Sequence, residues 1–188
     1  KDGKRIVKGR LVIRGFKDSQ GNLETYSGTA SRWSQRLICS VAAQHGWPLI
    51  SADVGTAFLQ GLTFEKMAEV TGEALREVCI KMPPQTIGLL KQFPKFKHFN
   101  PFTQTLKLVK PVYGLKDAPR AWRLMLDKIL TEINGFKMVV DRQIYMWHDE
   151  QGRLCLIAST HVDDLKVTGK PDWIDWLIKE IESRVGKL

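Results

Sequence analysis

The spacing of hydrophobic residues predicts three helices. Residues 31–46 have a serine cap at the start and a glycine at the end, and residues 118–135 carry a proline in the first turn. Residues 171–183 predict a closing amphipathic helix. The positions expected to face the core are Trp33, Leu37, Ile38, Val41 and Ala42 in the first helix, Trp122, Leu126, Ile129 and Ile133 in the second, and Trp173, Leu177 and Ile181 in the third.

Shorter apolar runs predict strands. Residues 5–16 alternate basic and apolar side chains, which is typical of a strand or hairpin with one basic face and one apolar face. Residues 62–76 are predicted to form a variable, partly helical segment. The other expected strands lie at 48–54, 76–84, 104–110, 144–148, 153–160 and 165–168, the last three joined by two tight turns. The order fits an α+β sandwich with helices packed against an antiparallel sheet.

Composition limits the class of protein without identifying it. The chain has 188 residues and is 43% hydrophobic, which is enough for one domain with a sizeable core. Its three cysteines are widely spaced and form no CxxC pair, so a reduced intracellular compartment is expected. The chain shows no signal-peptide pattern and no apolar run of about 18 residues, so no membrane association is expected.

The net charge of +9 is concentrated in two segments. Residues 1–17 carry seven basic side chains and one acid, and residues 91–123 carry eight basic side chains with Asp117 as the only acid. This distribution suggests binding to a polyanion, although solvated surface lysines would produce the same composition. The sequence contains no G-x-G-x-x-G after a strand, no Walker loop and no nucleophile elbow, so a nucleotide would be held in another way.

Three aspartates lie where predicted strands end. Asp53 closes the strand at 48–54, and Asp163 and Asp164 lie side by side at the mouth of the predicted hairpin. Taken alone, an adjacent acid pair is more often a solvated turn than part of a metal site. If the hairpin pairs beside the Asp53 strand, three carboxylates converge on one edge of the sheet. A divalent cation would then relieve their repulsion, and an all-oxygen set suits magnesium or manganese.

Four segments shift the balance towards a metal site. They are KGRLVIRGFK (8–17), SADVGTAFLQG (51–61), KPVYGLKDAPRAW (110–122) and HVDDLKVTG (161–169). In this order and at these separations, they resemble the reverse transcriptase domain of copia-type LTR retrotransposons. The usual wording of that family is K-A-R-L-V-A-R-G-F, D-V-K-T-A-F-L-N-G, S-L-Y-G-L-K-Q-A-P-R-A-W and Y-V-D-D. The resemblance covers essentially the whole chain, and YGLK-x-APRAW is its most specific element.

The resemblance implies a polymerase palm, with an antiparallel sheet packed on helices in a ferredoxin- or RRM-like core, plus a partial fingers subdomain. It places fingers-type elements at about 1–47 and 62–110, and the palm at 48–61 and 111–188. Because the chain ends soon after the helix that follows the catalytic hairpin, the thumb is expected to be absent or truncated. The whole chain, 1–188, is therefore expected to be a single reverse transcriptase domain fragment.

The same resemblance implies roles for individual residues. Asp53, Asp163 and Asp164 would be the catalytic aspartates and, with Val54, would hold two Mg²⁺ or Mn²⁺ ions. Phe58 would exclude a 2′-hydroxyl by a clash beneath the sugar, unless it is an ordinary core phenylalanine. The remaining nucleotide-binding candidates are Thr56 and Ala57 through their main-chain amides, Gly114, Lys8, Arg10 and Arg14. The template or primer candidates are Tyr113, Lys116, Arg120 and His161, whereas Trp122 is expected to be a core residue.

The implied activity is RNA-directed DNA polymerisation, by transfer of deoxynucleotides to a primer 3′-hydroxyl. The implied partners are an RNA or DNA template–primer, deoxynucleoside triphosphates and the rest of a Pol polyprotein, with integrase upstream and RNase H downstream. The family places such chains in cytoplasmic virus-like particles. Two alternatives stay open: an inactive or domesticated relic that only binds nucleic acid, and a two-metal nuclease, which would need neither Phe58 nor the YGLK loop.

The chain departs from the usual family motifs at several positions, and three of these lie in or beside the expected site. Gly55 replaces a lysine, Asp117 replaces a glutamine, and His161 replaces the tyrosine before V-D-D. None of these changes removes an expected metal ligand. They do suggest a copy with altered primer-end geometry or weakened catalysis.

Overall fold

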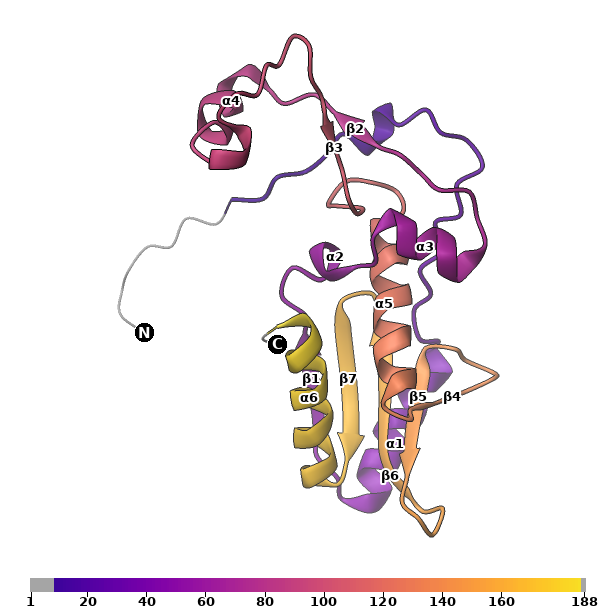
Figure 1. The fold of residues 1–188 in the computed structure, drawn as a ribbon. Helices are drawn as coiled ribbons and strands as arrows, with labels where there is room; N and C mark the ends of the chain where they lie inside the picture. Colours follow the sequence, from indigo (N-terminus) through magenta and orange to yellow (C-terminus); the bar gives the residue numbers. More distant parts are fainter. Residues whose placement is uncertain (1–8, 187–188) are drawn as a thin grey trace, which may run out of the picture. The chain divides into compact units, whose positions relative to one another are not determined.

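A computed structural model describes residues 9–186 of the chain, and these residues divide into two units. The first unit contains residues 9–62 and 111–186 and is built around a five-stranded antiparallel sheet with the order β1-β7-β6-β5-β4 (Figure 1). Its strands are β1 (Leu49–Asp53), β4 (Phe136–Lys137), β5 (Ile144–His148), β6 (Leu154–His161) and β7 (Asp164–Gly169). The predicted mixture of helices and an antiparallel sheet is therefore confirmed.

Five helical segments belong to the described part of this unit: the 3-10 helix η1 (Gly15–Lys17) and the α-helices α1 (Arg32–His45), α2 (Ala57–Gln60), α5 (Ala118–Glu132) and α6 (Pro171–Val185). The expected caps are present on α1. The hydroxyl oxygen of Ser31 accepts a hydrogen bond from the Ser34 amide at 3.1 Å, and Gly46 ends the helix with φ 63°. Proline lies in the first turn of both α5 and α6.

Helices cover both faces of the sheet, so β6 is buried on both sides. Successive residues of a strand point to opposite faces. Leu156 and Ala158 pack in the larger core cluster with Trp122 of α5 and Leu177 of α6, whereas Ile157 packs with Ile38 of α1. The inward positions predicted for α5 are all buried, which confirms its apolar face.

The second unit, residues 63–110, contains α3 (Phe64–Thr71), α4 (Pro84–Leu90), the 3-10 helix η2 (Pro94–Phe96) and a two-stranded antiparallel ribbon of β2 (Cys79–Ile80) and β3 (Leu106–Lys107). Phe64, Met67 and Phe99 are its buried apolar side chains. The partly helical excursion predicted for 62–76 is confirmed by α3. The strands predicted at 76–84 and 104–110 shrink to two residues each, and α4 was not predicted.

The prediction of a strand or hairpin at 5–16 is wrong for the residues that the structure describes. Residues 9–14 form no strand, and η1 follows them. The Ile13 amide donates to the Tyr113 carbonyl at 2.8 Å, but Leu11 and Val12 stay exposed, because no sheet face lies under this apolar alternation. Lys8 and the rest of the predicted basic face before it lie outside the described residues.

The buried face of α1 also differs from the prediction. Trp33 is 76% exposed and Leu37 is 40% exposed, and the buried positions are Ser34, Ile38 and Ala42. The polar Ser34 can be buried because its hydroxyl donates to the Asp141 carboxylate at 2.5 Å. Apolar spacing alone does not reveal a partner of that kind.

The cysteines Cys39, Cys79 and Cys155 are all free thiols, and only Cys155 is buried. Within residues 9–186, the helices lack the length or the apolar character that spanning a bilayer requires. The division into fingers and palm elements stays a prediction.

Candidate active site

A row of four residues crosses one end of the sheet of the first unit. The antiparallel register makes Asp53, the last residue of β1, the direct partner of Asp164, the first residue of β7. Asp164 is also the partner of His161 across the β6–β7 hairpin, and His161 forms an isolated bridge with Thr29. Side chains of directly opposed residues lie on one face of a sheet, about 5 Å apart at Cβ. The register therefore places two carboxylates and an imidazole on one face at this end of the sheet.

The two facing carboxylates repel each other. Asp53 and Asp164 are both exposed, whereas Asp163 in the adjoining turn is half-buried. Like charges directly opposite each other destabilise a sheet, and a bound cation reverses that effect. Without a bound cation, the pairing of Asp53 with Asp164 therefore lowers the stability of the sheet.

The turn between β6 and β7 consists of Val162 and Asp163, because His161 and Asp164 close the hairpin. Val162 has φ 58°, a left-handed conformation that is an outlier for a β-branched residue. The carbonyl of Asp163 accepts a hydrogen bond from the Val54 amide at 3.2 Å. The turn is therefore attached directly to the residue that follows Asp53.

The donor set suits a hard divalent cation, since carboxylates are the ligands that Mg²⁺ and Mn²⁺ prefer. The structure brings Asp53 and Asp164 together and places Asp163 in the adjoining turn. Among residues 9–186, however, no three or more His, Cys, Asp or Glu side chains are grouped closely enough to hold a metal ion. The residues fit such an ion by their chemistry and by the register of their strands, while their side chains do not form a three-ligand cluster.

The segment after β1 turns sharply into α2. Thr56 has φ 56°, and the Ala57 amide donates to the Val54 carbonyl at 3.2 Å. Ala57 is buried, and it packs in the larger core cluster. The amides of Thr56 and Ala57 were predicted to hold triphosphate oxygens, and the Ala57 amide donates instead to the Val54 carbonyl in this structure.

Phe58, Tyr113 and Arg10 lie together, although they are far apart in the sequence. The Phe58 and Tyr113 rings have centroids 5.2 Å apart, and the Arg10 guanidinium lies 4.8 Å from the Tyr113 centroid. A cation above an aromatic face is attracted to the ring quadrupole. Three candidate residues from separate segments therefore form one cluster, in which the Phe58 ring and the Arg10 guanidinium both lie against the Tyr113 ring.

Gly114 permits a close approach, and the approaching group is the chain itself. Gly114 has φ 94°, and a Cβ at this position would overlap the carbonyl oxygen of Ile13. A Cβ on Gly15 would likewise overlap the carbonyl oxygen of Gly114. Glycine at both positions thus lets the amino-terminal segment lie directly against the loop before α5.

The basic candidates lie in different surroundings. Arg14 and Lys116 are exposed. Arg120 is only 8% exposed, and its guanidinium donates to the Glu24 carbonyl at 3.2 Å. Its predicted contact with template or primer would therefore need a rearrangement, whereas Lys116 is accessible.

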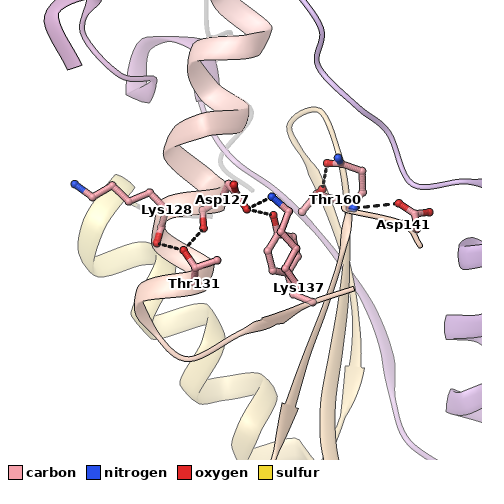
Figure 2. A network of polar contacts seen from close by, with 8 residues as sticks. Asp127, Lys128, Thr131, Lys137, Asp141 and Thr160 are labelled. Carbon is pink, nitrogen blue, oxygen red and sulfur yellow. Dashed lines mark hydrogen bonds and ion pairs between the residues drawn. The ribbon is translucent and has the colours of Figure 1, made fainter. Parts of the chain in front are cut away.

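A polar network beside the sheet was not predicted (Figure 2). Asp127 of α5 accepts hydrogen bonds from Lys137 at 2.5 Å and from the Tyr145 hydroxyl at 2.6 Å. Burial, and then the hydrogen bond to Asp127, raises the pKa of Tyr145. The sequence signal for this network was weak, consisting of one acid within the apolar pattern of α5.

Comparisons with known proteins add independent information. A family model described as "Reverse transcriptase (RNA-dependent DNA polymerase)" matches residues 1–184. The Retrovirus-related Pol polyproteins from transposons RE1 and RE2 of Arabidopsis thaliana are 31% and 30% identical to the chain over 164 residues, which is 86% of it. The corresponding polyprotein from transposon TNT 1-94 of Nicotiana tabacum is 30% identical over 165 residues, or 87% of the chain. The chain spans about a tenth of the length of these curated relatives. No solved structure matched it.

Proposed function

Since the chain belongs to the reverse transcriptase (RNA-dependent DNA polymerase) family, we propose that it is the polymerase part of a copia-type retrotransposon Pol polyprotein and adds deoxynucleotides to a primer 3′-hydroxyl. The observation that carries this proposal is the register of β1 and β7. It sets Asp53 opposite Asp164, with Asp163 in the turn beside them.

The three aspartates and Val54 are the proposed ligands of two magnesium or manganese ions. When bound, such ions lower the barrier to attack on the α-phosphate and to departure of pyrophosphate. The contribution of the chain is to concentrate negative charge at one end of the sheet. The bond from the Val54 amide to the Asp163 carbonyl keeps the two ligand-bearing segments in contact.

Phe58 is the proposed barrier to a 2′-hydroxyl. Its ring is half-buried and rests against Tyr113, which limits its freedom to move away from a sugar. Among the basic candidates, Arg10 lies against the Tyr113 ring, so we propose that Arg10 binds the triphosphate. Lys8, Arg14, Gly114 and the amides of Thr56 and Ala57 remain further proposed contacts of the nucleotide.

The proposed template contacts include the second unit. Residues 78–110 carry six lysines, Lys81, Lys91, Lys95, Lys97, Lys107 and Lys110, and no Asp or Glu. Phe93 and Phe102 are 62% and 95% exposed among these lysines. Lysines neutralise phosphates and exposed aromatic rings stack on bases, so this combination suits a single strand of RNA or DNA. Tyr113, Lys116, Arg120 and His161 are the proposed contacts of template or primer in the first unit.

The relatives are Pol polyproteins, which supports a polyprotein context for this chain. Integrase upstream and RNase H downstream are the proposed partners, and a cytoplasmic virus-like particle is the proposed location. The alternative is a domain that binds nucleic acid without turnover. A primer-extension assay separates the two.

That assay uses the 188-residue chain, an oligo(dT)-primed poly(A) template, and Mg²⁺ or Mn²⁺. Extension by the wild type should fall at least a hundredfold in Asp53→Asn and in Asp163→Asn, because each removes a proposed metal ligand. Asp175→Asn, on the exposed side of α6, is the matched control and should keep full activity. Template binding without extension by the wild type, with either ion, would leave the binding-only alternative.

A further inference from the structure

Trp122 makes a polar contact that its position in the core does not require. Its side chain is 0% exposed and lies in the second turn of α5. The indole N–H donates to the carbonyl oxygen of Val162 at 2.8 Å. A buried indole N–H needs an acceptor, and this one finds it in the turn that carries Asp163.

That turn needs an external constraint. Val162, the first of its two central residues, has positive φ, a conformation that normally calls for glycine. A β-branched residue there is strained, and such strain persists only where the surroundings hold it. Both turn carbonyls are held: that of Val162 by Trp122 and that of Asp163 by the Val54 amide.

The start of α5 is fixed in turn to the segment that follows Asp53. The Leu62 amide donates to the Ala121 carbonyl at 3.2 Å. A Cβ on Gly61 would lie only 3.0 Å from backbone atoms of Ala121 and Trp122, so the two segments are in close contact. One turn of α5 therefore touches the segments on both sides of the candidate site.

We propose that Trp122 is a positioning residue, whose indole N–H holds the Val162 carbonyl and thereby fixes the direction in which Asp163 and Asp164 present their carboxylates. This inference rests on the proposed function, since it concerns the geometry of the same aspartates. It assigns Trp122 no contact with nucleotide or metal.

The test removes one hydrogen bond and keeps an aromatic side chain at the position. Trp122→Phe removes the N–H, and Trp147→Phe is the matched control, because the buried Trp147 donates in the same way to the Ile133 carbonyl at 2.9 Å, at the opposite end of α5. Both variants should lower the melting temperature by similar amounts. Mn²⁺ binding, followed by the electron paramagnetic resonance signal of the free ion, should weaken about tenfold in Trp122→Phe and less than twofold in Trp147→Phe.

A second variant tests the mechanism itself. Val162→Gly removes the strain of positive φ, so adding it to Trp122→Phe should restore most of the Mn²⁺ affinity. The amide resonances of Asp163 and Asp164 should shift in Trp122→Phe alone, without metal present. If the double variant is more stable than Trp122→Phe, these resonances still show whether the conformation of the turn itself has changed.

The outcomes separate the two proposals. If Mn²⁺ binds to the wild type and is lost in Asp163→Asn, but Trp122→Phe binds as the wild type does, the positioning role is refuted and the proposed function stands. Equal weakening in Trp147→Phe would reduce Trp122 to a structural role and also refute the inference. A wild type that binds no Mn²⁺ overturns both, because the positioned ligands would then not be ligands.

Discussion

The Asp141 carboxylate links the start of α1 to the loop before β5. Its oxygens accept hydrogen bonds from the Ser31 amide at 2.8 Å, the Ser34 hydroxyl at 2.5 Å and the Gln143 amide at 3.0 Å. Two of these donors lie at the start of α1, where a negative charge also interacts favourably with the helix dipole. Asp141→Asn should therefore destabilise the first unit.

The magnitude follows from these contacts. Hydrogen bonds to an ionised group contribute about 1.5–3 kcal/mol each. Asparagine keeps one acceptor oxygen but turns an amide group, itself a donor, towards the remaining donors. Because the site is partly open to solvent, we expect the free energy of unfolding to fall by about 2 kcal/mol. For a chain of this size, that corresponds to a melting temperature lower by about 4–8 °C.

The loss should depend on pH with a definite sign. Burial opposes ionisation, but the hydrogen bonds from Ser34, Ser31 and Gln143 outweigh it and hold the pKa of Asp141 below its ordinary value of 3.8. The native state therefore binds this proton less readily than the unfolded state does. The stabilisation is complete well above pH 4 and disappears as the pH falls through the lower, native pKa.

Urea unfolding at pH 7, 5, 4 and 3, followed by circular dichroism, measures this directly. The difference in free energy of unfolding between the wild type and Asp141→Asn should be constant from pH 7 to 5 and should shrink below pH 4. The exposed Asp175→Asn serves as control and should differ by less than about 0.5 kcal/mol throughout. A difference for Asp141→Asn that is the same at pH 3 as at pH 7 would refute the reasoning.

Two further variants test other contacts. Tyr145→Phe should cost about 1 kcal/mol at pH 8 in urea unfolding, because the hydrogen bond to Asp127 is lost. Since the native pKa of Tyr145 is raised above 10.0, the wild type should lose this advantage as the pH rises above about 10, and a constant difference would count against the contact. Alanine at both Phe93 and Phe102 should weaken single-stranded RNA binding about tenfold or more in fluorescence anisotropy, with an unchanged salt slope because no charge is removed. Alanine at the exposed Phe136 of β4 is the control, and equal weakening there would argue against stacking.

Elements defined by local chemistry were predictable from the sequence. The boundaries of α1 follow from Ser31 and Gly46, and the inward face of α5 follows from its apolar spacing. The amino-terminal segment was not predictable, because its alternation of Leu11 and Val12 with arginines matches a strand, while the deciding contact is with Tyr113. A local pattern cannot report whether a neighbouring strand exists.

The polar contacts at the candidate site had the same limit. Trp122 was predicted as a core residue, and its burial confirms that. Its bond to Val162 joins residues 40 positions apart, and only the packed structure brings a donor and an acceptor together over such a separation. The strain at Val162 is equally invisible in the sequence, since valine normally favours extended backbone.

The face on which the aspartates lie follows from the apolar pattern. Ile50, Ala52, Leu165 and Val167 pack towards α5 and α6, so the alternate residues of both strands point to the opposite face. Asp53 is one of those alternate residues, and so is its partner Asp164.

Register decides the rest. A slip of one residue in β7 would bury Asp164 and expose Leu165. The burial of apolar side chains that stabilises the sheet therefore also excludes any pairing in which the two carboxylates are one position apart. The sequence shows His161 only as a substitution three residues before Asp164. The hairpin makes the two direct neighbours across β6 and β7. The histidine therefore bears on the geometry of a proposed metal ligand itself, and not only on the primer end.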